Sequence, residues 1–367
     1  MTIDIIAGAR PNFMKIAPII EAIEQAQQAG ASINYRLIHT GQHYDSKLSG
    51  TFFEQLGIPT PHVNLESGSG TQAQQTGNIM VRFEEDLLKN PCEVVLVVGD
   101  VNSTLACSIV AKKLNVQVVH VEAGIRSRDL TMPEEINRMV TDAITDQFFT
   151  TSEFANENLR KEGIDEHRIH FVGNTMIDTL LKNIPKLCKP AFFDEEGLVE
   201  KQYLVLTLHR PANVDEPHKL KALLEELIEN SGEHSLVFPV HPRTRKALND
   251  LVLSKPEKLV LTEPLGYHEF IWLVNNSMAV VTDSGGVQEE TTVLGIPCIT
   301  LRDNTERYET VTMGTNELIG TDPQAIKPNL EKLFGGTWKN GNIPPLWDGH
   351  TAERIVAKLL EIYGNKK

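Results

Sequence analysis

The chain has little positive charge for its length. Its 367 residues include 35 Lys and Arg against 49 Asp and Glu, which gives a formal net charge of −14. Nucleic acids and anionic membranes both select clustered Lys and Arg, so we expect neither as a partner. An anionic small molecule is still compatible with this charge, because it needs only a few local cations.

Long hydrophobic runs are also missing. The longest apolar runs, such as Val94 to Val98, are far too short to span a bilayer. A strand-like segment, Ile3 to Ala7, follows the initiator almost at once, so we expect no signal peptide. These features predict a soluble cytoplasmic protein.

Metal and cofactor motifs are scarce as well. The four cysteines, Cys92, Cys107, Cys188 and Cys298, include no Cys-x-x-Cys pair, and no His spacing suits zinc. We therefore expect no metal site, and we interpret the cysteines as small buried residues in a reducing compartment. The Gly-x-Gly-x-x-Gly fingerprint of NAD and FAD sites and the Gly-x-x-x-x-Gly-Lys-Ser/Thr loop of ATP sites are absent, so no cofactor is expected.

Short β-branched runs alternate with amphipathic helical stretches along the chain. This pattern is typical of parallel sheets with helices on both faces, so we predict an α/β protein made of two Rossmann-like units. Residues 186–201, which hold a Phe pair and an acidic cluster, break the pattern and are interpreted as a domain connection. The predicted strands are Ile3–Ala7, Tyr35–His39, Val94–Val98, Val116–Val121, Gln147–Thr150, Ile169–Val172, Tyr203–Leu208, Leu236–Val240, Leu259–Leu261, Ala279–Thr282 and Cys298–Leu301.

Glycines and ionisable residues gather where these strands end. The carboxyl ends of parallel strands form the ligand crevice of such sheets. Any single one of these residues is more often a cap or a loop hydrogen-bonding group, but the whole set favours a ligand site. The strand ends read Gly8-Ala9-Arg10-Pro11, Thr40-Gly41-Gln42-His43, Gly99-Asp100, Glu122-Ala123-Gly124, Gly173-Asn174, His209-Arg210, His241-Pro242-Arg243 and Asp283-Ser284-Gly285-Gly286.

The segment 280–290 carries the clearest functional pattern. A buried strand ends at Asp283, turns through Ser284, Gly285 and Gly286, and is expected to open a helix at Val287. The backbone N–H groups and the positive end of the helix dipole at such a turn can bind a phosphate or diphosphate. Glu290, one turn into the helix, could accept hydrogen bonds from a ribose or sugar hydroxyl. An ordinary strand-to-helix turn is the alternative.

Two further groups could bind or react with a ligand. Gly8, Arg10 and Lys15 could clasp an anion after the first strand, although Arg10 and Lys15 could equally be surface residues. Pro133 is expected at the first position of a helix, with Glu134 and Arg138 as an i, i+4 ion pair.

Three carboxylates are then expected near strand ends. Glu134 joins Asp100 and Glu122 there. Three carboxylates are enough to move protons on both faces of a substrate.

On its motifs the chain is identified as a member of the non-hydrolysing UDP-N-acetylglucosamine 2-epimerases, which it resembles nearly end to end. The resemblance implies a glycosyltransferase-B-like architecture, in which two Rossmann-like domains face each other across a cleft, and a homodimer. It implies domains at 1–177 and 178–350, with the final helix, 351–367, packing back onto the first. The motifs that carry it are residues 8–18, 97–104, 120–127, 132–138, 173–178, 208–210, 282–290 and 302–307.

The resemblance also implies roles for individual residues. The catalytic candidates are Asp100, Glu122, Glu134 and His209. The implied binding site for the UDP-N-acetylhexosamine substrate comprises Arg10, Lys15, Arg138, His241, Phe270, Ser284, Gly285, Gly286, Glu290 and Arg307, with Phe270 near the uracil. A second, activating UDP-sugar would contact Gln42, Arg210 and His241.

The chemistry of this reaction suits those residue types. The hydrogen at C2 of an N-acetylhexosamine is not next to a carbonyl, so simple deprotonation is too costly. Elimination of UDP across C1 and C2, followed by re-addition with a proton on the opposite face, would invert C2 without NAD. Such a route needs a base, an acid and cations or a helix N-terminus for the departing diphosphate.

The chain departs from the family pattern at three places. Pro211-Ala212-Asn213 follows Arg210, Tyr44-Asp45 follows His43, and residues 67–75 contain no arginine. Activation by a second substrate molecule is therefore either lost or mediated by a rearranged site. The alternatives for activity are a 2-epimerase of UDP-diacetamido-uronic acids, a hydrolysing 2-epimerase, a glycosyltransferase of the same fold and a non-catalytic nucleotide-sugar sensor.

Overall fold

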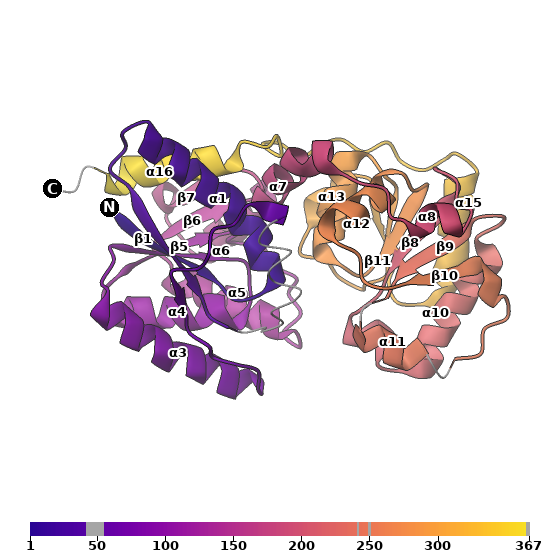
Figure 1. Cartoon of the computed structure of the whole chain (residues 1–367), viewed down its shortest axis with the longest axis horizontal. Helices are drawn as coiled ribbons and strands as arrows, with labels where there is room; N and C mark the ends of the chain where they lie inside the picture. Colours follow the sequence, from indigo (N-terminus) through magenta and orange to yellow (C-terminus); the bar gives the residue numbers. More distant parts are fainter. Residues whose placement is uncertain (42–54, 241, 249–250, 365–367) are drawn as a thin grey trace. The chain divides into compact units, whose positions relative to one another are not determined.

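The structure is a computed structural model that describes residues 1–41, 55–240, 242–248 and 251–364. The chain forms two compact units, one made of Met1–Lys182 with Pro345–Lys367 and the other of Asn183–Pro344. They are called unit 1 and unit 2 below (Figure 1). Among the described residues, no helix combines the length and apolarity needed to cross a membrane.

Unit 1 is built on a seven-stranded parallel sheet with the order β3-β2-β1-β4-β5-β6-β7. Its strands are β1 (Thr2–Ala7), β2 (Asn34–His39), β3 (Val63–Asn64), β4 (Val94–Val98), β5 (Gln117–Val121), β6 (Gln147–Thr150) and β7 (Ile169–Phe171). Its helices are α1 (Arg10–Gln28), α3 (Gln72–Lys89), α4 (Asn102–Lys113), α5 (Pro133–Ile144), α6 (Glu153–Lys161), the short η1 (Glu166–Arg168), α7 (Thr175–Asn183), which runs into unit 2, and α16 (Thr351–Tyr363).

Unit 2 repeats the design with six parallel strands in the order β10-β9-β8-β11-β12-β13. Its strands are β8 (Tyr203–Thr207), β9 (Ser235–Pro239), β10 (Leu259–Thr262), β11 (Ala279–Thr282), β12 (Cys298–Thr300) and β13 (Asn316–Leu318). Its helices are η2 (Ile184–Lys186), α8 (Phe192–Glu195), α9 (Pro211–Val214), α10 (Pro217–Asn230), α11 (Pro242–Leu248), η3 (Pro256–Lys258), α12 (Tyr267–Asn275), α13 (Gly285–Leu294), α14 (Tyr308–Thr312), η4 (Pro323–Ala325) and α15 (Ile326–Phe334).

The two-unit α/β prediction is confirmed, and every predicted strand is present to within one residue at each end. Strands β3 and β13 were missed. β3 has only two residues, and β13 (Asn316-Glu317-Leu318) has no apolar run that could distinguish it from a loop.

Alternate residues of the strands build separate cores on the two faces of the unit 2 sheet. Leu204 and Leu206 of β8 pack against α10 and α15, whereas Tyr203 and Val205 pack with residues of α12 and α13. Because side chains of a strand point alternately to opposite faces, a continuous apolar run is what a sheet covered on both sides requires.

Residues 186–201 are part of unit 2 and not a free connection. They contain α8, whose Phe193 is buried and packs edge-on against Tyr203 and Trp272, with ring centroids 5.5 and 5.0 Å apart. The Phe pair that interrupts the sequence pattern is therefore core.

The end of the chain packs on unit 1, where α16 lies beside α1 (Figure 1). The carboxylate of Asp178 accepts hydrogen bonds from the backbone N–H groups of Thr351 and Ala352, at 3.2 and 2.7 Å, and so caps α16. The buried Trp347 donates from Nε1 to the carbonyl of Thr151 at 2.9 Å. These contacts anchor the last helix on the first sheet.

Candidate active site

Each sheet reverses its winding at one point, between β1 and β4 in unit 1 and between β8 and β11 in unit 2. Ligands of such sheets bind outside the carboxyl ends of the strands at this reversal. Gly8 and Asp100 follow β1 and β4, and His209 and Asp283 follow β8 and β11. Two of the predicted catalytic residues, Asp100 and His209, thus follow strands at the positions where the fold favours a ligand.

Two carboxylates share one buried arginine at the end of β4. Arg138 of α5 is 1% exposed and donates from Nε and Nη2 to Glu135 Oε2, at 2.9 and 2.7 Å, while its Nη1 binds Asp100 Oδ2. Burial alone would raise the pKa of Glu135, but hydrogen bonds from the Ser127 N–H and from Arg138 lower it. Arg138 therefore holds the carboxylates of Glu135 and Asp100 beside each other at the end of β4.

The sequence predicted Glu134 as the ion partner of Arg138, and on α5 the partner is Glu135. Both lie within one helical turn of the arginine, but Glu135 is buried beside it and Glu134 is exposed. A catalytic role for Glu134 does not depend on that pair and stays a prediction.

A second ion pair covers the turn that leads into Asp100. Lys15 Nζ lies 2.6 Å from Glu122 Oε2, and both side chains are buried. Lys15 Nζ and Glu122 Oε1 lie 2.8 and 3.9 Å from the point where a Cβ of Gly99 would stand. The structure therefore places Lys15 and Glu122 beside the Gly99–Asp100 turn, and Asp100 and Glu122 follow strands, as the sequence analysis expected.

The predicted anion clasp after β1 stays a prediction. A Cβ at Gly8 would stand 2.0 Å from Ser103 Oγ and 2.6 Å from Thr40 Oγ1, so this glycine allows close packing. Lys15 contacts a carboxylate, as described above. The side chain of Arg10 lies outside the described residues.

A cavity of about 340 Å³ opens beside Asp100 and Glu134, at the first turns of α3, α4 and α5. Asn102 donates from Nδ2 to Gln75 Oε1 at 2.7 Å, and Asn137 donates to the carbonyl of Asp100 at 2.9 Å. The cavity combines carboxylates for acid and base chemistry with amides that hold their backbone.

In unit 2 the turn after β11 opens α13 two residues earlier than predicted. The helix begins at Gly285, with Ser284 at the N-cap, because glycine adopts helical as readily as turn conformations. The Ser284 side chain makes no capping hydrogen bond. The first N–H groups of α13 thus belong to the residues predicted to bind a diphosphate, Gly285 and Gly286.

Asp283 holds the catalytic candidate His209. Its fully buried carboxylate lies 3.1 Å from His209 Nδ1 and accepts hydrogen bonds from the N–H groups of His209 and Arg210 and from Asn213 Nδ2. Burial would raise the pKa of Asp283, but His209 and these donors lower it. A carboxylate beside Nδ1 favours a proton there and leaves the exposed edge of the ring, whose side chain is 44% accessible, for acid or base chemistry.

Glu290 lies on α13 next to α12. It is buried and accepts a hydrogen bond of 3.3 Å from the hydroxyl of Tyr267, whose pKa is raised by burial and by Glu290. Phe270, predicted near the uracil, is partly buried one turn further along α12. The structure therefore groups Glu290, Tyr267 and Phe270 on neighbouring helices.

Arg307 is 5% exposed and its Nε lies 2.6 Å from Glu289 Oε1. Nearby, Arg302 donates from Nη2 to Glu306 at 2.7 Å, and Glu306 Oε1 would stand 2.9 Å from a Cβ on Gly285. The loop that follows β12 is thus held against the start of α13 by buried charges. A substrate contact of Arg307 stays a prediction.

Of the three residues predicted to contact a second UDP-sugar, the structure describes Arg210 alone. Gln42 and His241 lie outside the described residues. Arg210 donates from Nε to the carbonyl of Asp283 at 2.9 Å, so it supports the same turn as His209.

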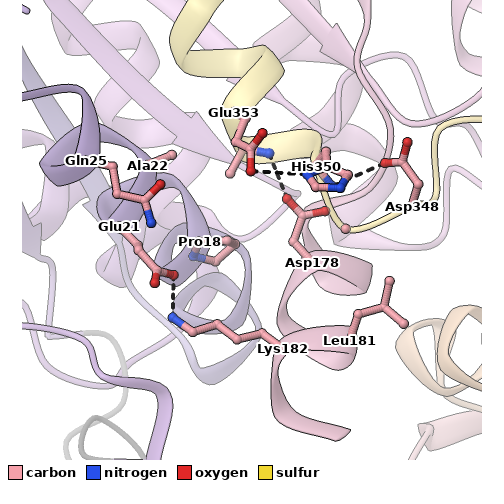
Figure 2. Close-up of a pocket in the computed structure, with 12 residues that line it drawn as sticks. Pro18, Glu21, Ala22, Gln25, Asp178, Leu181, Lys182, Asp348, His350 and Glu353 are labelled. Carbon is pink, nitrogen blue, oxygen red and sulfur yellow. Dashed lines mark hydrogen bonds and ion pairs between the residues drawn. The ribbon is translucent and has the colours of Figure 1, made fainter. Parts of the chain in front are cut away.

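A second hollow of unit 1, of about 410 Å³, lies among α1, α7 and the start of α16 (Figure 2). Asp178, which caps α16, the Lys182–Glu21 pair and the His350–Glu353 pair line it. None of the predicted site residues is among those that line it. In the described part of the chain, no group of three or more His, Cys, Asp or Glu residues could hold a metal ion.

Sequence reasoning missed several residues that support the site. Glu135, Asn102 and Asn137 are polar or charged residues in helices, and only the fold shows that they lie near the end of β4. Asp283 was noticed at a strand end, but its pairing with His209, 74 positions earlier, has no local signal.

Known proteins share this sequence and fold. The family profile UDP-N-acetylglucosamine 2-epimerase matches residues 25–360. The UDP-N-acetylglucosamine 2-epimerase of Methanocaldococcus jannaschii is 43% identical over 371 residues, covering 98% of this chain and 99% of that protein. A UDP-2,3-diacetamido-2,3-dideoxy-D-glucuronate 2-epimerase of Pseudomonas aeruginosa is 39% identical, covering 98% and 99%.

Solved structures agree with these sequence matches. The crystal structure of the Methanocaldococcus jannaschii UDP-GlcNAc 2-epimerase in complex with UDP-GlcNAc and UDP has a TM-score of 0.87 to this chain at 42% identity. The match covers 98% of this chain and 100% of the Methanocaldococcus jannaschii chain. With the profile, the full-length identity and the fold in agreement, this chain belongs to the UDP-N-acetylglucosamine 2-epimerase family.

Proposed function

We propose that this chain interconverts UDP-N-acetylglucosamine and UDP-N-acetylmannosamine by elimination and re-addition of UDP. The observation that carries the proposal is the cluster at the end of β4 and β5. There Asp100 is bound to Arg138, and Glu122 is bound to Lys15. Membership of the epimerase family and the relatives named above support the same activity.

Elimination accounts for the need for carboxylates. A base removes the C2 proton, the C2–H electrons form the C1–C2 double bond, and the C1–O bond to UDP breaks with its electrons leaving on the diphosphate. Re-addition returns UDP to C1 while an acid delivers a proton to the other face of C2. Asp100, Glu122 and Glu134 are the candidates for these transfers, and positioned side chains of this kind contribute about 10²- to 10⁴-fold.

Unit 2 supplies groups suited to the nucleotide. The N-terminus of α13 at Gly285 and Gly286 would stabilise the negative charge that develops on the leaving diphosphate. His209, oriented by Asp283, would donate or accept a proton there. Glu290 would bind a ribose hydroxyl, and Phe270 would contact the base.

Because of the Pseudomonas aeruginosa relative, a UDP-diacetamido-uronic acid is the second candidate substrate. The relative's 39% identity is close to the 43% of the Methanocaldococcus jannaschii protein. The same elimination applies to both sugars, because it uses only C1, C2 and UDP. Parallel assays with the two UDP-sugars distinguish them.

Proton NMR of the chain with UDP-N-acetylglucosamine in deuterated water tests the function. We expect the mannosamine epimer to form without added NAD or divalent metal, and solvent deuterium to enter C2. Release of free N-acetylmannosamine would instead indicate a hydrolysing enzyme. Turnover with C2 fully protonated would exclude the elimination route, and UDP binding without turnover would indicate a sensor.

The protein would work as a cytoplasmic homodimer. Its described cysteines are free thiols, which suits a reducing compartment; Cys107 and Cys298 are buried as predicted, whereas Cys92 is partly buried and Cys188 is exposed. On α5, Ile136, Met139 and Val140 are 48%, 43% and 39% exposed at i, i+3 and i+4 spacing. An apolar row on one helix face supports a protein contact there.

A further inference from the structure

A buried histidine lies directly behind the acid and base cluster. His120 of β5 is 0% exposed. Its Nε2 lies 2.8 Å from the carbonyl oxygen of Gly99, and its Nδ1 lies 2.7 Å from Asp142 Oδ1. Both ring nitrogens therefore face oxygen atoms.

These contacts define where the ring protons are. A carbonyl oxygen only accepts hydrogen bonds, so Nε2 carries a proton. A neutral ring with that proton would point the Nδ1 lone pair at a carboxylate oxygen 2.7 Å away. Two arrangements avoid the repulsion: a proton on Nδ1, or a proton on Asp142.

The surroundings of Asp142 favour the first arrangement. Its Oδ2 accepts a hydrogen bond from the Gly124 N–H at 3.0 Å and lies 2.7 Å from Arg126 Nη1. Arg126 also binds Glu162 at 2.7 Å, so the four groups balance their charges when His120 is a cation.

The His120 ring contacts the turn that carries Asp100. Gly99 has a φ of +65°, and its carbonyl is bound by His120. The next carbonyl, of Asp100, is bound by Asn137, and the Asp100 carboxylate is bound by Arg138. Because the peptide plane between Gly99 and Asp100 is rigid, fixing the first carbonyl also fixes where the Asp100 side chain starts.

We propose that His120 is a buried imidazolium that positions Asp100 through the Gly99 carbonyl, with Asp142 as its permanent counterion. The positioning role rests on the proposed function, in which Asp100 transfers a proton. The charge of His120 does not rest on it. His120 is a positioning residue, since it contacts the backbone of the turn and not the substrate.

The charge is measured on the unmodified protein. The full chain, labelled with ¹⁵N-histidine, is examined by ¹H–¹⁵N NMR at pH 7.5, and the signal missing from His120→Gln assigns residue 120. We expect directly bonded protons on both ring nitrogens. In Asp142→Asn the amide can donate to Nδ1, so the ring should become neutral while Nε2–H remains. One bare ring nitrogen in the unmodified protein would overturn the proposal.

The positioning role is measured by kinetics with UDP-N-acetylglucosamine. His120→Leu removes the donor to Gly99, and we expect kcat to fall by about 10- to 100-fold with KM within about twofold, because small misplacements of catalytic groups cost this much. His120→Gln keeps an N–H donor and should recover part of kcat. His170→Gln, a strand histidine of the same unit, is the control and should retain normal kcat.

The kinetic results test the positioning role of His120, and the NMR results test its charge. Normal kcat in His120→Leu, or no recovery in His120→Gln, overturns the positioning role. If His120→Leu does not fold, His120→Gln against His170→Gln decides it. If the unmodified protein leaves C2 unchanged, the proposed function fails, while the NMR signals of His120 still report its charge.

Discussion

At the scale of single residues, the candidate carboxylates of each unit lie next to cations. Asp100 pairs with Arg138, Glu122 with Lys15 and Asp283 with His209. An opposite charge within hydrogen-bond distance favours the ionised form of a carboxylate. In unit 1, the pairs of Asp100 and Glu122 place two acids beside one turn, which suits an enzyme that must both remove and return a proton.

Replacing the carboxylates by amides tests which of them react. Asp100→Asn, Glu122→Gln and Glu134→Gln should each raise the barrier by about 2 to 4 kcal/mol if the residue is an essential acid or base, because an amide cannot act as a general acid or base. Initial rates of epimerisation measure the change.

Glu157→Gln is the matched control for these variants. Glu157 is exposed on α6 of the same unit and should retain the full rate. A near-normal rate in any of the three test variants removes that residue from the catalytic candidates.

A single substitution at the start of α13 tests the predicted binding of UDP. Gly285 is the first residue of α13, and a Cβ there would stand 2.9 Å from Glu306 Oε1. Gly285→Val should therefore abolish UDP binding while the protein remains folded. Calorimetric titration with UDP gives the affinity, and thermal melting reports the fold.

The control for this variant is Gly77→Val on α3, where no atom lies within 4 Å of the added Cβ. It should bind UDP normally. UDP affinity that is unchanged in Gly285→Val would mean that the turn is only structural.

At the scale of elements, β7 and α16 create a pH-sensitive contact. Burial lowers the pKa of His170 on β7 to about 4, and the charge of Lys358 on α16 contributes. The folded protein therefore holds this ring neutral, with Nε2 2.7 Å from Gln147 Oε1. The unfolded chain takes up a proton at a higher pH.

This difference predicts a loss of stability in acid. Between about pH 6.5 and 4 the unfolded chain binds more protons at His170, so the free energy of unfolding falls as pH falls and is fully retained above that window. Because the ring is only half-buried, we discount the effect to about 1 kcal/mol. Urea unfolding at pH 7.5 and 5.0 measures it.

His170→Gln should lose less stability than the unmodified chain over this interval. His218→Gln, whose side chain is 83% exposed, should behave like the unmodified chain. An identical pH dependence in His170→Gln would contradict the prediction.

At the scale of the whole molecule, the exposed apolar row on α5 predicts the assembly. We expect light scattering to give the mass of a dimer, twice 40.9 kDa. Met139→Lys should shift the mass toward a monomer, because a charge in an apolar contact loses hydration without a partner. Val199→Lys, at a 52% exposed apolar residue of unit 2, is the control.

A dimer that is unaffected by Met139→Lys would place the contact elsewhere. A monomer in the unmodified protein would contradict the homodimer itself.

Much of the architecture could be predicted from the sequence, because strand and helix patterns are local. The apolar runs Val94–Val98, Gln147–Thr150 and Ala279–Thr282 match β4, β6 and β11 residue for residue. The helices α5, starting at Pro133, and α16 also follow local patterns. The glycine-rich turn and the strand-end residues indicated the site, because parallel strands collect their ends at one edge.

The amino-acid sequence by itself determined the two α/β units, the order of the motifs and the residue types available for chemistry. Only the tertiary structure decided their partners: Arg138 binds Glu135 and not Glu134, Lys15 binds Glu122, and Asp283 binds His209. The structure also shows the contact of α16 with α1 that the family resemblance implied. Periodicity and turn chemistry extend over a few residues, whereas an ion pair depends on which side chains the folded chain buries within hydrogen-bond distance.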